Sequence, residues 1–136
     1  MKPVFVDTAG WFTMLDADDR GHAAACAARD AILRRRGRLI TTDFVVDETL
    51  TLLRMRAGLD AAARWWWSLG ASDRIAIERI GPERMDRALE WFFGWPDQRF
   101  SFTDCTSFAV MRELGLERAL TGDPHFAAAG FQLLPG

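Results

Sequence analysis

The sequence predicts an α/β protein, a three-layer α/β/α sandwich whose central sheet is twisted and mainly parallel. Two observations predict it. Short apolar runs alternate with helix-like segments along the whole chain, and no tight two-residue hairpin turn joins any two of the runs. Parallel strands need long crossover connections, and the helix-like segments supply them.

The first half of the chain contains three of the predicted strands. Residues 4–6 form a buried strand that ends at Asp7, and residues 38–42 and 74–78 form the next two. Between them we expect helices at 11–15, 22–36, 44–56 and 59–69. Gly37 ends the helix at 22–36 and Gly58 ends the helix at 44–56. Thr42 or Asp43 caps the start of the 44–56 helix.

The second half contains two more strands, at 119–121 and 131–134. A helix runs from Pro82, a residue suited to the first helical turn, to about Gly94. A second helix, capped by Thr103, ends at Gly115, and a brief third one opens at Asp123.

Length and composition limit the possible classes of protein. With 136 residues, 49% hydrophobic and 26% charged, residues 1–136 are expected to form one globular domain rather than a disordered chain. We expect no signal peptide and no membrane span, because no apolar run approaches about 20 residues. The two cysteines lack metal-site spacing, which predicts a reduced, cytoplasmic protein. A net charge of −2 gives no indication of nucleic-acid binding by composition alone.

Acidic side chains follow the strands at the places where the crevice of an open α/β sheet would lie. Asp7 follows the first strand, Asp123 follows the fourth, and Asp104 lies at the start of a late helix. On a helical wheel Glu48 falls on the inward arc of its helix, whereas Asp47 falls on the outward arc. A buried carboxylate is costly unless it is paired or bound to metal, so the four acids together predict a site for a hard divalent cation.

Each acid taken alone has a simpler explanation. Asp104 and Asp123 would serve as helix caps, Asp7 would start a turn, and Glu48 would pair with an arginine such as Arg56 on the same helix. The metal hypothesis therefore depends on all four carboxylates converging.

Four stretches of the chain resemble PIN-domain proteins, and more closely the VapC-like ribonuclease toxins of toxin–antitoxin pairs. They occur in the order and spacing of that family and extend over nearly the whole chain. The stretches are Phe5-Val6-Asp7-Thr8, Val46-Asp47-Glu48-Thr49-Leu50, Phe102-Thr103-Asp104-Cys105-Thr106-Ser107-Phe108, and Leu120-Thr121-Gly122-Asp123-Pro124-His125-Phe126.

The resemblance implies a PIN-like fold and a nuclease site. Asp7, Glu48, Asp104 and Asp123 would be the acidic quartet that binds Mg²⁺ or Mn²⁺ and uses metal-activated water to hydrolyse RNA phosphodiester bonds. A cognate antitoxin protein, an RNA substrate and a homodimer are the implied partners. Ala9 stands where many relatives carry a small polar residue. The supporting hydroxyls would come from Thr8, Thr103, Ser107 and Thr121.

Other features have ordinary explanations. His22 and His125 are expected to be surface or capping side chains, and the basic run at 34–38 a solvated helix end, with RNA attraction as the alternative. Three consecutive tryptophans at 65–67 cover too wide an arc to be buried together. They and the aromatic residues at 91–95 predict a partner surface, with base stacking or core packing as alternatives.

Competing functions remain open on the sequence alone. One is a PIN-like RNA- or protein-binding module without cleavage activity, and another is an RNA-processing nuclease outside any toxin–antitoxin pair. A phosphoacceptor receiver or a haloacid-dehalogenase-like phosphatase would need a lysine in the pocket. The only lysine, Lys2, precedes the first strand, at the wrong end of the sheet.

Overall fold

The computed structural model describes residues 1–136, and its sheet has five parallel strands in the order β3-β2-β1-β4-β5. This arrangement confirms the predicted α/β class with its parallel central sheet. The strands are β1 (Val4–Val6), β2 (Leu39–Thr42), β3 (Ile75–Glu78), β4 (Arg118–Leu120) and β5 (Gln132–Leu134).

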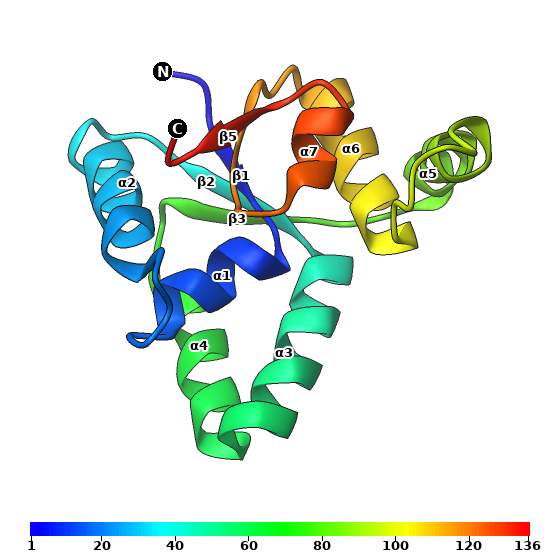
Figure 1. The fold of residues 1–136 in the computed structure, drawn as a ribbon. Coiled ribbons are helices and arrows are strands. Elements are labelled where there is room, and N and C mark those ends of the chain that lie inside the picture. The colour runs from blue at the N-terminus through cyan, green and yellow to red at the C-terminus, as the bar shows by residue number, and fades with distance from the viewer.

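Seven helices connect the strands, and Figure 1 shows α1 to α4 on one side of the sheet with α5, α6 and α7 on the other. None of them is long and apolar enough to cross a membrane. They are α1 (Thr8–Leu15), α2 (His22–Arg34), α3 (Asp43–Ala57), α4 (Leu59–Ala71), α5 (Pro82–Gly94), α6 (Phe102–Leu114) and α7 (Pro124–Ala128).

The direction of chain travel reverses beside β1. From β1 the chain moves outward through β2 to β3, then crosses to β4 on the other side of β1 and continues to β5. Right-handed crossovers place the connecting helices of the two halves on opposite faces. The carboxyl ends of β1 and β4 are therefore neighbours at a topological switch point, which is where ligands bind in open α/β sheets.

The core lies on both faces of β1 and β4. Val4, Phe5 and Val6 are fully buried, as parallel strands covered on both faces require, and Phe108 and Phe126 pack edge to face on the α6–α7 side. The helices α3 and α4 form a pair that extends away from the sheet (Figure 1).

Two helix starts differ from the prediction. The first helix begins at Thr8 rather than at residue 11, because the Asp7 side chain accepts the Gly10 N–H and acts as the N-cap. In α6 the cap is Ser101, not Thr103. The Ser101 hydroxyl accepts the Asp104 N–H and Asp104 accepts the Ser101 N–H, a reciprocal capping box that uses both side chains.

Candidate metal centre

Three of the four predicted acids lie at helix N-termini beside the switch point. Asp7 caps α1 directly after β1, Asp123 caps α7 after β4, and Asp104 occupies the first turn of α6. The partial positive charge of a helix N-terminus favours each ionised carboxylate. Three such termini converge here, so the backbone offsets part of the repulsion among the acids.

Gly10 lets α1 sit close enough to β4 for this convergence. A Cβ at this position would collide with the carbonyl oxygen of Leu120, the last residue of β4. Asp7 lies three residues before Gly10, and Asp123 lies three residues after Leu120. The close contact that a glycine permits therefore keeps the two aspartates at the same edge of the sheet.

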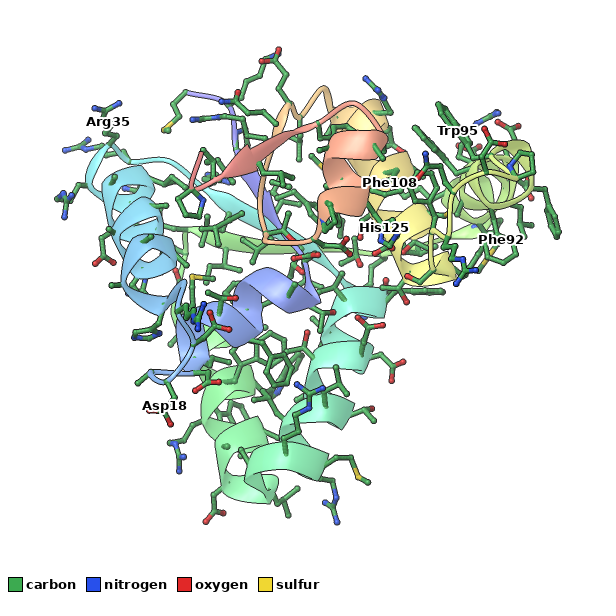
Figure 2. All side chains as sticks on the ribbon, viewed as in Figure 1. Asp18, Arg35, Phe92, Trp95, Phe108 and His125 are labelled. Carbon is green, nitrogen blue, oxygen red and sulfur yellow. The ribbon has the colours of Figure 1, made fainter.

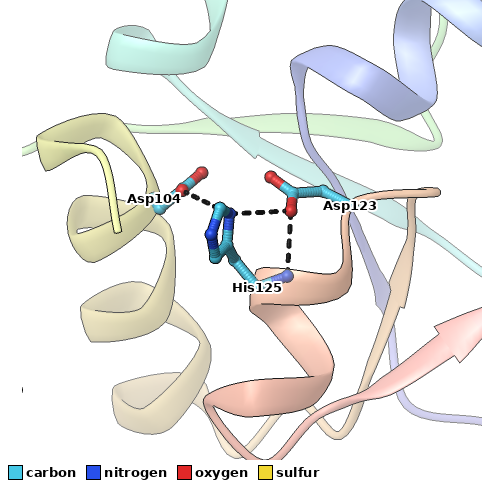
Figure 3. Close-up of side chains that lie close together, drawn as sticks. All are labelled: Asp104, Asp123 and His125. Carbon is cyan, nitrogen blue, oxygen red and sulfur yellow. Dashed lines mark hydrogen bonds and ion pairs between the residues drawn. The ribbon is translucent and has the colours of Figure 1, made fainter. Parts of the chain in front are cut away.

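One carboxylate oxygen of each of the three aspartates accepts a hydrogen bond from a backbone N–H. The donors are Gly10 to Asp7 at 2.8 Å, Ser101 to Asp104 at 3.1 Å and His125 to Asp123 at 2.9 Å. The second oxygens of Asp104 and Asp123 form no hydrogen bond within the protein, and Figure 3 shows them turned toward each other. Anchored carboxylates with free oxygens are suited to coordinating a hard cation.

His125 lies between two of these aspartates, where sequence reasoning predicted only a surface or capping side chain. Its Nδ1 lies 2.9 Å from Asp123 Oδ1 and 3.8 Å from Asp104 Oδ2 (Figure 3). An ionised carboxylate only accepts, so Nδ1 donates to Asp123. One ligand atom from each of the three residues fits within 4.8 Å of the others. The sequence signal that could have predicted this placement is that His125 lies only two residues after Asp123.

Burial raises the pKa of Asp7 to about 7, and the negative charges of Asp123 and Asp104 add to this rise. The hydrogen bonds from Gly10 and the Thr121 hydroxyl oppose it. Asp7 is only 6% exposed, and no lysine or arginine forms an ion pair with it or with the other two aspartates. A bound cation would supply the missing positive charge.

Burial also raises the pKa of Asp104, with a further contribution from the Asp123 charge. The Ser101 hydrogen bonds lower it. Its neighbour Cys105 is fully buried, and burial raises the pKa of that thiol to about 11, so Cys105 stays protonated and is no nucleophile.

Asp7 lies outside the tight group of Asp104, Asp123 and His125 whose ligand atoms come within 4.8 Å, although it is near enough for the charges of Asp104 and Asp123 to raise its pKa. The structure does not bring Glu48 into this tight group either. It is half-buried on α3, while Asp47 beside it is exposed, as the helical wheel predicts. Glu48 forms no ion pair, and the predicted alternative partner Arg56 instead lies over the Phe12 ring. The next residue, Thr49, donates to the Thr8 hydroxyl at 3.4 Å, so this part of α3 lies beside the start of α1.

The predicted supporting hydroxyls have mixed outcomes. Thr121 accepts the Asp123 N–H at 2.9 Å, and Thr8 accepts from Thr49. Ser107 donates to the Thr103 carbonyl in its own helix at 3.2 Å, so its support of the acids stays a prediction. Thr103 contributes that carbonyl rather than a contact to an acid.

The chain is similar to known proteins over nearly its whole length. The family described as PIN domain matches residues 4–132. The chain belongs to the PIN domain family. The "23S rRNA-specific endonuclease VapC20" of Mycobacterium tuberculosis is 34% identical over 131 residues, which cover 94% of this chain and 95% of that protein. The same name and identity occur in two strains of that organism.

Solved structures agree with the PIN assignment. The crystal structure of M. tuberculosis VapC20, titled a sarcin–ricin loop cleaving toxin, has a TM-score of 0.82 and 32% identity, covering 94% of this chain and 95% of that one. FitAcB from Neisseria gonorrhoeae has a TM-score of 0.70 at 14% identity, covering 96% and 95%, and shows the PIN fold alone.

Proposed function

We propose that this PIN-domain protein is a divalent-metal-dependent endoribonuclease that acts as the toxin of a toxin–antitoxin pair. The single observation that carries the proposal is that Asp104 and Asp123 lie together, with Asp7 near enough to feel their charges, and that none of the three has a lysine or arginine partner. A fold keeps mutually repelling carboxylates at a crevice chiefly to hold hard cations. The name of the relative VapC20, an endonuclease, supports the reaction class.

Asp7, Asp104, Asp123 and Glu48 are the proposed ligands for Mg²⁺ or Mn²⁺. The donor set fits, because carboxylate oxygens are the ligands these ions prefer, and the convergent aspartates supply three of them. When bound, such an ion lowers the pKa of a coordinated water and neutralises charge on a phosphodiester. Glu48 would complete the set from α3.

The protein's own part is to position these groups. The capping box with Ser101 fixes Asp104, and the His125 ring and backbone both donate to the same oxygen of Asp123. These contacts lock each rotamer before substrate arrives, which is the preorganisation that a reactive site needs.

The proposed macromolecular partners are an RNA substrate, a cognate antitoxin and a second copy of the chain, all in the cytoplasm. An apolar surface on α3 and α4 supports a protein partner, because it is lined by seven hydrophobic residues, two of which are exposed tryptophans. The free cysteines are consistent with a reducing compartment. The apolar surface consists of Val46, Leu50, Leu59, Ala62, Ala63, Trp66 and Trp67.

The direct test is cleavage of RNA by the purified protein with Mg²⁺ or Mn²⁺ and with EDTA. Because VapC20 is described as a sarcin–ricin loop cleaving toxin, an RNA that contains this loop is the first substrate to test. We expect cleavage with either ion, none with EDTA, and at least about a hundredfold loss in Asp104→Asn. Cleavage that persists in EDTA or in Asp104→Asn would refute the proposal.

Glu48 needs its own test because it lies outside the tight group. Glu48→Gln is expected to weaken Mn²⁺ binding in calorimetry about tenfold or more and to slow cleavage. Asp47→Asn is the matched control, since Asp47 is the adjacent acid on the same helix and is exposed. Equal behaviour of the two variants would remove Glu48 from the ligand set.

A further inference from the structure

Trp95 is a surface tryptophan that the hydrophobic core holds in a fixed position. Its ring stacks on Trp91 with centroids 5.4 Å apart and planes only 12° from parallel, yet its side chain is 43% exposed. Trp91 in turn packs 5.2 Å from Phe108, which is fully buried. Trp91 therefore covers one face of Trp95, although Trp95 is 43% exposed, and Figure 2 shows Trp95 beside α5 at the outer side of the molecule.

A short series of rings links Trp95 to the acidic site. Phe100 lies 6.2 Å from Trp95 and 5.7 Å from His125, measured between ring centroids, and His125 contacts Asp123. In an unstacked RNA strand successive phosphates are about 6–7 Å apart, roughly twice the stacked rise. A phosphodiester at the aspartates would thus bring a base one or two nucleotides away to Trp95.

The charge of the site favours a contact of this kind. The convergent aspartates repel RNA phosphates, the chain carries a net charge of −2, and no lysine or arginine pairs with these acids. Stacking on a base adds affinity without requiring positive charge, and it tolerates any base because each has a π-face. The exposed segment 96–99 that follows Trp95 also offers one cation, Arg99, to the backbone.

We infer that Trp95, backed by Trp91 and Phe100, is the stacking platform for an unpaired RNA base beside the cleaved phosphodiester. The inference rests on the proposed ribonuclease function and adds the part of the substrate that this surface recognises. A base on the open side of Trp95 would continue the parallel stack that Trp91 begins.

The test separates binding from chemistry by measuring KM and kcat for a short single-stranded RNA, and its Kd in EDTA, where no cleavage occurs. For Trp95→Ala we expect Kd and KM to rise about 5- to 100-fold, the range for losing one stacked base, with kcat within about threefold. Trp95→Phe keeps a ring and should recover most of the loss. Phe93→Ala is the matched control, because Phe93 is 75% exposed at the end of α5, two residues before Trp95, and its one ring contact is with Phe92.

An RNA series makes the test independent of whether Trp95→Ala folds. Replacing one nucleotide at a time by an abasic one should weaken wild-type binding most next to the cleavage site. The same replacement should still weaken binding to Trp95→Phe, which keeps a stacking ring, and should matter little to Trp95→Ala, which has already lost the stacking contact. No position-dependent loss in the wild type would overturn the inference.

Other outcomes distinguish this inference from the function on which it rests. If Trp95→Ala matches the wild type in Kd and KM while Asp104→Asn abolishes cleavage, the platform is refuted and the ribonuclease stands. If the wild type cleaves no RNA with either ion, the proposed function fails and the inference with it. If Trp95→Ala loses RNA binding and light scattering shows that its oligomeric state has also changed, the surface is an interface between copies of the chain. The platform is then refuted.

Discussion

The two edges of the sheet, one where the parallel strands begin and one where they end, carry opposite charges. The charges also differ in how far they are buried and paired. Cations precede the strands, with Lys2 before β1, Arg38 before β2 and Arg74 before β3, and they are exposed or half-buried. Carboxylates follow the strands, with Asp7 after β1 and Asp123 after β4. At the first edge charge is solvated or paired, as Lys2 is with Glu117 at 2.8 Å.

The difference teaches which charges have a function. A solvated cation costs little free energy, and an exposed pair contributes little. A buried, ionised carboxylate without a cation costs free energy, and the raised pKa of Asp7 reflects that cost. The proposed metal ion would compensate for it. The basic run at 34–38 lies at the first edge, where α2 ends and β2 begins, so the sheet separates it from the aspartates. Figure 2 shows Arg35 at that end of α2.

Asp43 gives a second comparison, this time within the acidic edge. It follows β2 directly, but its Oδ1 accepts backbone N–H groups from Phe44 and from Ile80 beyond β3. It is half-buried, and these two hydrogen bonds connect the start of α3 with the segment after β3. Asp43 therefore has a structural role, because its carboxylate bridges two backbone donors and does not belong to the group of Asp104, Asp123 and His125.

The largest expected effect is on cleavage. Asp123→Asn should reduce kcat at least about a hundredfold, because it removes a charged ligand while leaving an oxygen to cap α7. Asp43→Asn is the control from the same edge and should keep kcat within about twofold, while losing about 1 kcal/mol of stability from weaker hydrogen bonds. Single-turnover kinetics and thermal unfolding measure both. Equal kinetic losses would contradict the distinction between the two acids.

The next effect is on stability and tests how the acidic edge is built. Gly10→Ala should lower the free energy of unfolding by about 1–3 kcal/mol, because the new methyl group collides with the Leu120 carbonyl. Gly70→Ala in α4 meets no atom within 4 Å and should instead gain about 0.5–1 kcal/mol from helix propensity. Urea unfolding measures the two. A neutral Gly10→Ala would show that α1 is free to shift.

A third prediction concerns pH. With a folded pKa of about 7 against 3.8 in the unfolded chain, folded metal-free Asp7 keeps a proton that the unfolded chain loses between these values. Stability without metal should therefore fall as pH rises from about 4 to about 7, by about 1–3 kcal/mol. Asp7→Asn should remove this slope and be more stable than the wild type at pH 8 in EDTA.

The same linkage predicts that metal binding releases protons below about pH 7, so that Mn²⁺ affinity rises with pH through that window. Melting temperatures at pH 5 and pH 8 in EDTA, and calorimetry in two buffers, measure these effects. A wild-type protein more stable at pH 8 than at pH 5 in EDTA would argue against a protonated Asp7.

The smallest effects are expected at the basic edge. Lys2→Ala and Arg35→Ala should shift the melting temperature by less than about 2 °C, because both side chains are exposed. Cleavage should stay within about twofold, since neither residue lies at the edge where the strands end. A strong loss of RNA cleavage in Arg35→Ala would bring the basic run back as a substrate contact.

Local sequence signals were sufficient for most of the fold. Apolar runs, glycine stops and Pro82 located all five strands and the long helices, and the comparisons confirm the predicted PIN-domain family. Helical geometry alone also predicted that the tryptophans at 65–67 are not buried together, and the structure buries Trp65 while Trp66 and Trp67 are exposed. Capping choices were harder, because Ser101 and Thr103 are both good caps and only the geometry with Asp104 selects Ser101.

The sequence by itself determined the order of elements and the identity of the acids that follow the strands, because periodicity, turn residues and strand polarity are local or nearly so. The tertiary structure alone decided that Asp7, Asp104 and Asp123 converge, that His125 joins them, that Glu48 lies outside the tight group and that Asp43 is satisfied by backbone. Those outcomes depend on the close approach at Gly10 and on the packing of α6 and α7 against the sheet. Such distances between remote segments are set by packing, which no local pattern encodes.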